Sequence, residues 1–237
     1  MISIINNILS NNGYKRVDID LQLDIAATYL YCPSDLSTRE EYFVTVRLHT
    51  QSDAAVKAVL EEQAQELFEA ISYSGKIGES FEKNCTMLLC HDEDEIDRQT
   101  MLELEEDQYN FKKNVIAYTH QEFVALQAYL AQEKIEKITN NVINSIINAE
   151  SGKSFLEFKE NNKKQNDHYS LILKAALKLP FVTYIPQEQQ LTNLLLEIKD
   201  SLPPDQSSIY SQLVNLDVEW AEENIHQQVE RIWGGLV

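Results

Sequence analysis

The chain has 237 residues, of which 43% are apolar, and it carries 6 glycines and 5 prolines. This length can bury one sizeable core, with or without a helical extension packed on it, and so few glycines and prolines exclude an all-β protein rich in tight turns. The formal charge of −18 disfavours direct binding to DNA or to an anionic membrane, and suits either solubility or an acidic face that docks on a basic partner.

Cysteine usage and hydropathy favour the cytoplasm. Cys32, Cys85 and Cys90 are odd in number and show no CxxC spacing, so neither a disulfide framework nor a zinc knuckle is indicated. The first residues lack a basic region followed by a long apolar core. No window reaches the roughly 18 apolar residues that a membrane-spanning helix needs. We expect a cytoplasmic protein that is neither secreted nor membrane-spanning.

Helix and strand patterns alternate through the first half of the chain. Apolar residues at helical spacing over residues 2–9 predict a short helix, and strict alternation over residues 17–25 predicts a half-buried strand. A second strand, or a continuation of the first, is expected over residues 26–31. Residues 41–48 are the clearest strand, because they are rich in aromatic and β-branched side chains.

A helix and one more strand complete this half. Residues 53–72 carry apolar side chains on one helical face, and Asp53 is placed to cap that helix. Residues 86–90 are typical of a buried strand, and an acidic run over residues 91–97 follows them. Residues 101–104 are an additional strand candidate, or the end of a helical turn. The pattern predicts an α+β protein with a small mixed sheet covered by a helix.

The second half shows only helical signals. Thr119 and Glu122 form a capping box, with aromatic residues at the hydrophobic-staple positions, so a helix begins here. Apolar residues then recur at helical spacing in four stretches, 135–146, 169–177, 191–202 and 218–232. We expect an α+β domain over residues 1–118, followed by a helical bundle over residues 119–237 that packs on it.

Motifs that would bind a ligand or a metal are incomplete. Gly152-Lys153-Ser154 resembles the end of a phosphate loop, but Ile147 stands where that motif needs a glycine. Residues 152–167 are loop-like and follow a helix pattern instead of a strand. The run over residues 91–97 lacks the glycine and the terminal glutamate of a calcium loop, and the 5 histidines stand singly. We predict no catalytic residue, no metal site and no cofactor.

The predicted order α-β-β-β-α-β resembles the core of restriction-endonuclease-like folds. Their catalytic strand carries an acid, one intervening residue and a lysine, whereas the best strand here begins Glu41-Tyr42-Phe43 and lacks that lysine. Asp24 is a candidate for another metal ligand, although one acid on the polar face of a strand is ordinary. If the chain has this fold, an inactive domain is favoured over a nuclease.

Residues 101–119 are the most distinctive stretch, because consecutive acids, aromatics and paired lysines adjoin a short apolar run. Such groups in a connecting segment anchor it by charge-assisted hydrogen bonds and ring burial, and they equally suit a docking surface. The sequence leaves both uses open. The predicted partner-binding residues are Glu105, Glu106, Asp107, Tyr109, Phe111, Lys112 and Lys113.

These residues, followed by Tyr118-Thr119, resemble the segment found in middle components of bacterial ABC three-component systems, including those of Lamassu-type defence. The resemblance covers mainly residues 41–123, and Gln108 replaces the proline expected after the acidic triplet. It implies a small, non-catalytic subunit that joins an SMC-like ATPase to an effector, often a nuclease, in defence against phage or plasmids. The DNA contacts would then belong to the ATPase, while this acidic subunit binds protein.

Two other classes of function stay open. A divergent metal-dependent nuclease, or another enzyme, would cleave DNA in isolation and lose that activity when Asp24 or Glu41 is changed. An antitoxin-like acidic inhibitor would form a tight binary complex with a basic partner, without an ATPase. The accessory subunit instead predicts copurification with a coiled-coil ATPase.

Overall fold

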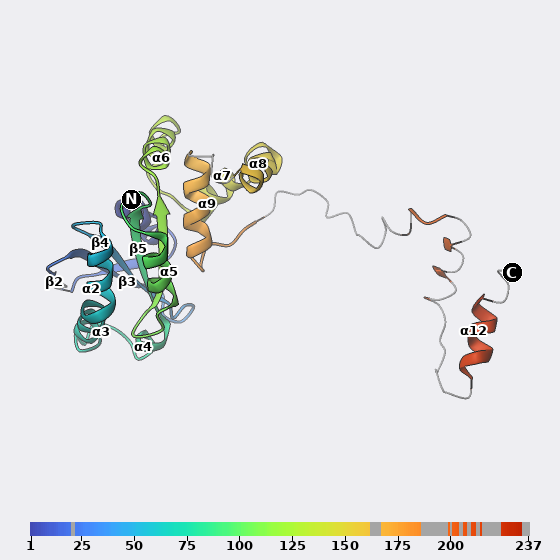
Figure 1. Cartoon of the computed structure of the whole chain (residues 1–237), viewed down its shortest axis with the longest axis horizontal. Helices are drawn as coiled ribbons and strands as arrows, with labels where there is room; N and C mark the ends of the chain where they lie inside the picture. The colour runs from blue at the N-terminus through green and yellow to red at the C-terminus, as the bar shows by residue number, and fades with distance from the viewer. Residues whose placement is uncertain are drawn as a thin grey trace. The chain divides into compact units, whose positions relative to one another are not determined.

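The computed structural model describes residues 1–19, 22–161, 167–185, 199, 201–203, 206–207, 210–211, 214 and 224–233 (Figure 1). The chain divides into two compact units, Met1–Gln187 and Glu188–Val237. The first unit holds the sheet. The described part of the second unit includes the amphipathic helix α12 (Ile225–Trp233). A helix was predicted over residues 218–232, and most of the described residues of that range lie in α12. The boundary at residues 118 and 119 stays a prediction.

The sheet has a path of five strands and one short extra strand. Its strands are β1 (Tyr14–Val17), β2 (Gln22–Leu23), β3 (Ala26–Pro33), β4 (Tyr42–Leu48), β5 (Cys85–Asp92) and β6 (Lys112–Tyr118). They lie in the order β1-β3-β4-β5-β6, and β2 also pairs with β3. The pairs formed by β3 are antiparallel, whereas β4, β5 and β6 run parallel. This mixed sheet confirms the predicted α+β class.

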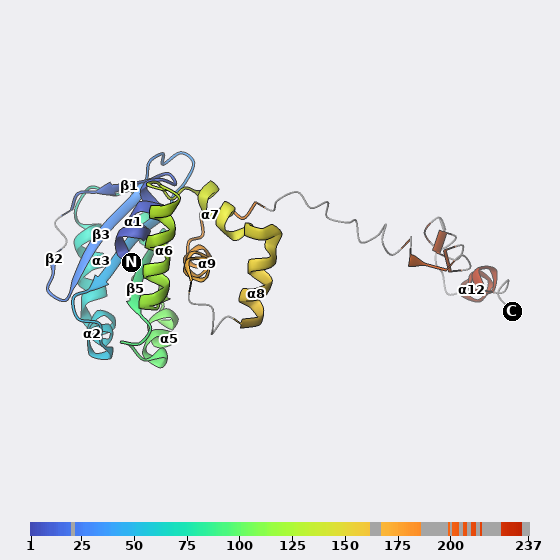
Figure 2. The same cartoon turned by 90° about the horizontal axis from the view of Figure 1, so that it is seen from above.

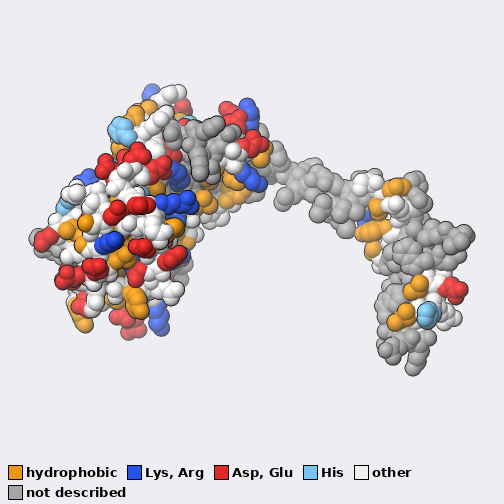
Figure 3. Space-filling model, in the orientation of Figure 1, with side chains coloured by type: hydrophobic (Ala, Val, Ile, Leu, Met, Phe, Trp, Pro, Cys, Tyr) orange, Lys and Arg blue, Asp and Glu red, His pale blue; other side chains and the backbone are white. Residues whose placement is uncertain are grey.

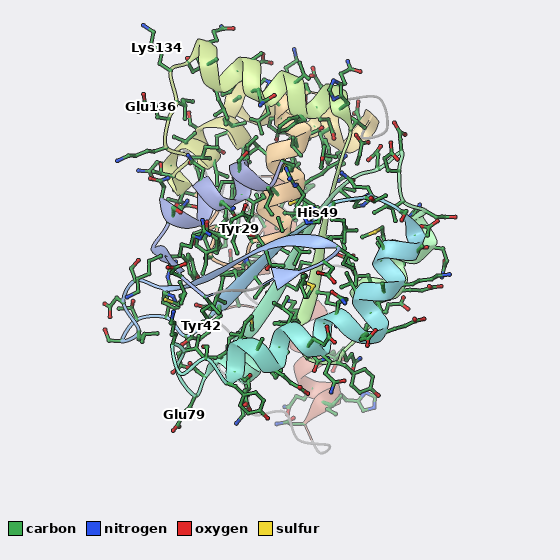
Figure 4. The ribbon with its side chains drawn as sticks, turned by 90° about the vertical axis from the view of Figure 1, so that its left-hand side faces the viewer. Tyr29, Tyr42, His49, Glu79, Lys134 and Glu136 are labelled. Carbon is green, nitrogen blue, oxygen red and sulfur yellow. The ribbon has the colours of Figure 1, made fainter. Side chains whose placement is uncertain are left out.

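Helices cover both faces of the sheet, as Figures 2 and 4 show. One face carries α1 (Ile2–Ser10), α6 (His120–Gln132), α7 (Asn140–Ile147), the 3-10 turn η2 (Ala149–Gly152), α8 (Lys153–Asn161) and α9 (His168–Lys178). The other face carries α2 (Asp53–Ala58), the π-helical turn η1 (Val59–Gln63), α3 (Ala64–Ser72), α4 (Phe81–Asn84) and α5 (Arg98–Glu106).

Two apolar cores follow from the alternation of side chains along the central strands. Phe43 and Leu88 pack in the core under α1 and α6, whereas Val44 and Leu89 pack in the core under α2 and α3. Successive side chains of a strand point to opposite faces, so a strand covered on both sides is apolar along its whole length. The predicted strands at residues 41–48 and 86–90 have this composition, and both are confirmed as β4 and β5.

The strand predicted over residues 17–25 is divided in two. Val17 ends β1 opposite Leu30, and Gln22 begins β2 opposite Ala27. β1 and β2 therefore pair with β3 in different registers, and they do not form one continuous strand. Sequence alternation alone does not reveal this change of register.

The helix predicted over residues 53–72 is present as α2, η1 and α3, but its cap differs. Ser52, in an extended conformation, accepts a hydrogen bond from the backbone N–H of Ala55 at 3.3 Å, so Ser52 and not Asp53 is the N-cap. The Asp53 carboxylate accepts from the backbone N–H of Asp97 at 2.9 Å instead. Asp53 thereby links α2 to the segment that begins α5.

The capping box predicted at residue 119 is confirmed. Thr119 accepts from the backbone N–H of Glu122 at 3.1 Å, and Glu122 accepts from that of Thr119 at 2.9 Å. Beyond α6, Lys134 adopts a left-handed φ of 53°. The carbonyl of Glu136 in the same loop accepts from Asn7 Nδ2 at 2.8 Å, which ties the loop to α1 (Figure 4).

Two predictions for the later segments need correction. Within residues 152–167, which were expected to be loop-like, residues 153–161 form α8, because Phe158 packs against the core beside Tyr169. Within 135–146, the helix begins only at Asn140. Most of the predicted 191–202 helix lies outside the described residues. Among the helices that the structure describes, none combines the length and apolarity needed to cross a membrane.

Candidate functional site

The distinctive stretch begins in a helix. Asp97 caps α5 by accepting from the backbone N–H of Gln99 at 3.1 Å. Met101 and Leu104 are buried together at the spacing of one helical turn, whereas Leu102 is exposed. In a strand, Leu102 and Leu104 would share a face. The strand alternative for residues 101–104 is therefore wrong, and the helical alternative holds.

Residues 112–118 form β6, where the sequence led us to expect a connecting segment. Two lysines and an asparagine open this strand, a composition that is unusual for a strand. Its parallel pairing with the buried strand β5, which sets Ile116 opposite Cys90, supplies the backbone partners. β6 is thus the edge strand on one side of the sheet, and it lies between α5 and α6 in the chain.

The loop before β6 closes around a buried ammonium group. The Lys113 side chain is only 1% exposed and forms an ion pair with Asp107. Its Nζ also donates to the carbonyls of Tyr109 at 2.6 Å and Phe111 at 3.4 Å. Asn110, with a left-handed φ of 63°, allows the loop to make this tight turn. Asp107 and Lys113 therefore fix the path of the chain into β6.

Phe111 anchors the same loop to the core under α3. Its side chain is fully buried, and its ring lies 5.2 Å from that of Phe68 in an edge-to-face arrangement and 6.4 Å from that of Phe81. Such arrangements favour aromatic pairs beyond the area that they bury. The Phe111 ring is thus committed to intramolecular packing.

Glu105 joins α5 to the outer edge of β6 and to α9. Its Oε1 accepts from the backbone N–H of Val115 at 2.8 Å and from Lys178 Nζ at 2.5 Å. Asn114 Nδ2 donates to the carbonyl of Lys178 at 2.9 Å. We call the ion pair between Glu105 and Lys178 the first clamp.

The remaining predicted partner-binding residues lie at the surface. Glu106, Tyr109 and Lys112 are exposed, and the Tyr109 side chain is 77% exposed. The seven residues therefore divide into four with intramolecular partners, Glu105, Asp107, Phe111 and Lys113, and three that face solvent. Partner binding by this stretch stays a prediction, and the exposed three are its best candidates.

A second ion-pair cluster lies at the other end of β6. Glu122 is 1% exposed, accepts a hydrogen bond from the hydroxyl of Ser170, and pairs with Lys174 Nζ at 2.9 Å. Lys174 also reaches Glu93, at 3.3 Å. We call the ion pair between Lys174 and Glu93 the second clamp. The sequence did not reveal this cluster, because its members come from three separate segments, α6, α9 and the loop after β5.

A cleft of about 640 Å³ adjoins α5 and β6. Acidic side chains line it at Glu93, Asp94 and Glu105, and apolar side chains line it at Met101, Leu102 and Ala117. This site was missed because it requires β6, which was not predicted. The acidic run over residues 91–97 was its only sequence signal.

His91 also lines this cleft and is buried. Its Nδ1 lies 2.8 Å from the carbonyl oxygen of Asp92, so Nδ1 carries the proton, since a carbonyl only accepts. Nε2 is buried without a partner among the described residues. Burial lowers the pKa of His91 below its ordinary value of 6.5. The imidazole is therefore neutral near pH 7.

The motifs considered for phosphate and metal binding have other surroundings in the structure. Lys153 lies at the start of α8, where it pairs with Glu157 at 3.5 Å and Glu150 at 4.0 Å. Asp92 ends β5, and the remainder of the acidic run forms the loop before α5. No group of three or more His, Cys, Asp or Glu side chains suited to a metal ion occurs among the residues that the structure describes.

Comparison with known proteins gives one match. The family model described as ABC-three component (ABC-3C) system Middle Component 1 matches residues 41–146. This range begins just before β4 and ends in α7, so it includes the cleft, the loop around Lys113 and the capping box. Searches of curated proteins and of solved structures give no significant match.

Proposed function

We propose that this chain is a middle component of an ABC-three component system, as the match over residues 41–146 supports, and that it is a non-catalytic accessory subunit joining an SMC-like ATPase to an effector nuclease. The family match carries this proposal. In the more specific form of this proposal, the subunit belongs to a Lamassu-type system that acts against phage or plasmids. The matched range holds both the anchored loop and the exposed residues Glu106, Tyr109 and Lys112.

The nucleophilic side chains support a non-catalytic role. Cys32, Cys85 and Cys90 are free and buried, which also fits a reducing cytoplasm. Burial raises the pKa of Cys90 to about 12 and that of Cys85 well above its ordinary value. The thiolate is the nucleophilic form, so burial disfavours nucleophilic chemistry at Cys85 and Cys90 near neutral pH.

The charge supports protein contacts over nucleic-acid contacts. The formal charge of −18 repels a phosphate backbone, so contact with DNA falls to the ATPase and nuclease in this proposal. An acidic subunit that binds basic faces of two other proteins needs no cofactor of its own.

The test is purification of the tagged full-length chain, expressed together with its neighbouring genes, followed by identification of the bound chains. We expect a coiled-coil ATPase and a nuclease in fixed ratio. Recovery of one small basic protein without an ATPase would favour the antitoxin-like inhibitor. Recovery of no partner would contradict both.

The exposed residues allow a sharper test of the docking surface. The double variant Tyr109→Ala, Lys112→Glu should weaken assembly at least about tenfold, because exposed aromatic residues and charges at an interface act as anchors. The matched control is Tyr73→Ala, Lys57→Glu, since Tyr73 is 85% exposed and Lys57 is also at the surface. Equal assembly by both variants would place the interface elsewhere.

The sheet topology supports one second candidate, an inactive restriction-endonuclease-like domain. The antiparallel strands β1, β3 and β4 and the parallel strand β5 follow the predicted α-β-β-β-α-β order. Asp24 lies between β2 and β3, and Glu41 precedes β4. DNA incubated with the chain and Mg²⁺ or Mn²⁺ should stay intact. Cleavage that disappears in Asp24→Ala or Glu41→Ala would make the chain a nuclease.

A further inference from the structure

The outer edge of β6 carries backbone groups that point away from β5. β6 is the last strand on its side of the described sheet. The N–H of Val115 bonds to Glu105, whereas the carbonyl of Tyr118 accepts from the N–H of Glu93, which follows β5, at 3.0 Å. Backbone groups alternate in direction along a strand. The N–H and carbonyl of Ala117 therefore point outward, as those of Val115 do.

The two clamps leave a gap at Ala117. The first clamp, Glu105 with Lys178, covers the outward N–H of Val115. The second clamp, Lys174 with Glu93, lies one turn earlier in α9 and adjoins Tyr118 through the Glu93 backbone. Ala117, which is half-buried, lies between these points and lines the cleft. An exposed strand edge of this kind is a template for pairing with another chain.

The cleft beside this gap suits an apolar side chain. Met101 and Leu102 of α5 line it together with Ala117, and its volume is about 640 Å³. Leu102 is 40% exposed, so apolar surface is accessible there. A strand added along β6 would direct alternate side chains toward α5, and therefore into this cleft.

The surroundings of the cleft are acidic. Lys174 and Lys178 already pair with Glu93 and Glu105. Further exposed carboxylates lie on the loop before α5 and on α5 itself, at Asp94, Glu95, Asp97, Glu103 and Glu106, against the single cation Arg98 in these segments. On the face of the first unit seen in Figure 3, acidic side chains cover more of the surface than basic side chains do. Charge complementarity therefore selects a basic ligand.

We propose that the open end of β6 binds an extended, basic segment of a partner protein, which pairs with the backbone of Ala117 as an added strand. An apolar side chain of this segment enters the cleft, and its lysines or arginines lie against Asp94 and Glu95. This inference rests on the proposed function, because the segment would belong to another subunit of the same assembly.

The test measures binding to the purified full-length chain of a fluorescent synthetic peptide in which lysines and valines occupy every second position, separated by threonines, so that both share the strand face that turns toward α5. We expect micromolar binding that weakens with salt. A peptide with the same side chains but N-methylated along one edge should bind at least about tenfold more weakly, because it cannot pair as a strand. The matching glutamate-valine peptide should not bind. Absence of binding by the lysine-valine peptide would overturn the proposal.

Variants of the chain locate the binding. Ala117→Pro removes only an outward N–H, which edge strands tolerate, and should reduce binding about tenfold. Ala117→Ser keeps the N–H and should bind as the native chain does. Asp94→Lys with Glu95→Lys should weaken binding and reduce its salt dependence. Equal binding by Ala117→Pro and the native chain would overturn the proposal.

Hydrogen exchange decides the case in which Ala117→Pro does not fold. In the native chain, the bound peptide should slow exchange of the Ala117 amide, and unchanged exchange would overturn the proposal. The proposed function fails separately. If the chain binds the peptide but captures no ATPase, the accessory role is excluded and this site is kept. If the chain captures the ATPase, and neither Ala117→Pro nor excess peptide changes that capture, this site alone is excluded.

Discussion

The two ends of β6 use similar residues in opposite ways. At its start, Lys113 and Phe111 turn inward, and the loop from Asp107 closes around them. At its other end, carboxylates and lysines form clamps at the surface, and Ala117 lies between them beside a cleft. The difference separates a structural anchor from a surface able to bind a partner. Four predictions, from the largest effect to the smallest, test this separation.

Phe111→Ala should cause the largest loss. Removing a fully buried ring beside Phe68 leaves a cavity, and we expect the free energy of unfolding to fall by about 4 kcal/mol. Urea unfolding followed by circular dichroism measures this change. Tyr109→Ala, two residues away and exposed, is the control and should change it by less than about 0.5 kcal/mol. Equal losses would remove the distinction between anchor and surface.

Lys113→Met should be the next most costly change. It leaves the Asp107 carboxylate and the carbonyls of Tyr109 and Phe111 without their donor, so we expect a loss of about 3 kcal/mol. The control Lys112→Met alters the exposed neighbour and should have little effect. If the two variants unfold at the same urea concentration, the buried ion pair does not hold the loop.

Glu122→Gln tests the cluster at the other end of β6. The amide can still accept from the backbone of Thr119 but no longer offers a charge to Lys174, and we expect a loss of about 1.5 kcal/mol. Glu133→Gln, an exposed acid just after α6, is the matched control. A loss as large as that of Lys113→Met would mean that both ends of β6 are anchored alike.

The smallest effect concerns His91 and pH. Burial lowers its pKa, so below pH 6.5 the unfolded chain binds more protons at this residue than the folded chain does. This contribution to stability is present in full above pH 6.5 and is lost as the pH falls through that value toward the folded pKa. His91→Gln should therefore lose less stability than the native chain between pH 7.5 and pH 5. Parallel losses in urea unfolding would show that His91 is not protected from protonation.

The candidate site could be predicted only in part. The chemistry of residues 105–113 was visible, because consecutive acids, rings and lysines are unusual. Their division into inward and outward groups was not visible, since Lys112 and Lys113 are chemically identical and differ only in the face of β6 that each occupies. Glu122 was predicted as a cap, but its partners Ser170 and Lys174 lie too far along the chain for any local pattern to reveal.

The sequence by itself determined the elements whose signals are local. The capping box at Thr119, the helix over residues 53–72 and the strands β4 and β5 all follow from spacing and side-chain type within a few residues. Only the tertiary structure decided that residues 112–118 form a strand, because a polar strand at the edge depends on pairing with β5. The cleft at Ala117 exists for the same reason, since α5 and the loop before it form it together with the ends of β5 and β6 at one edge of the sheet.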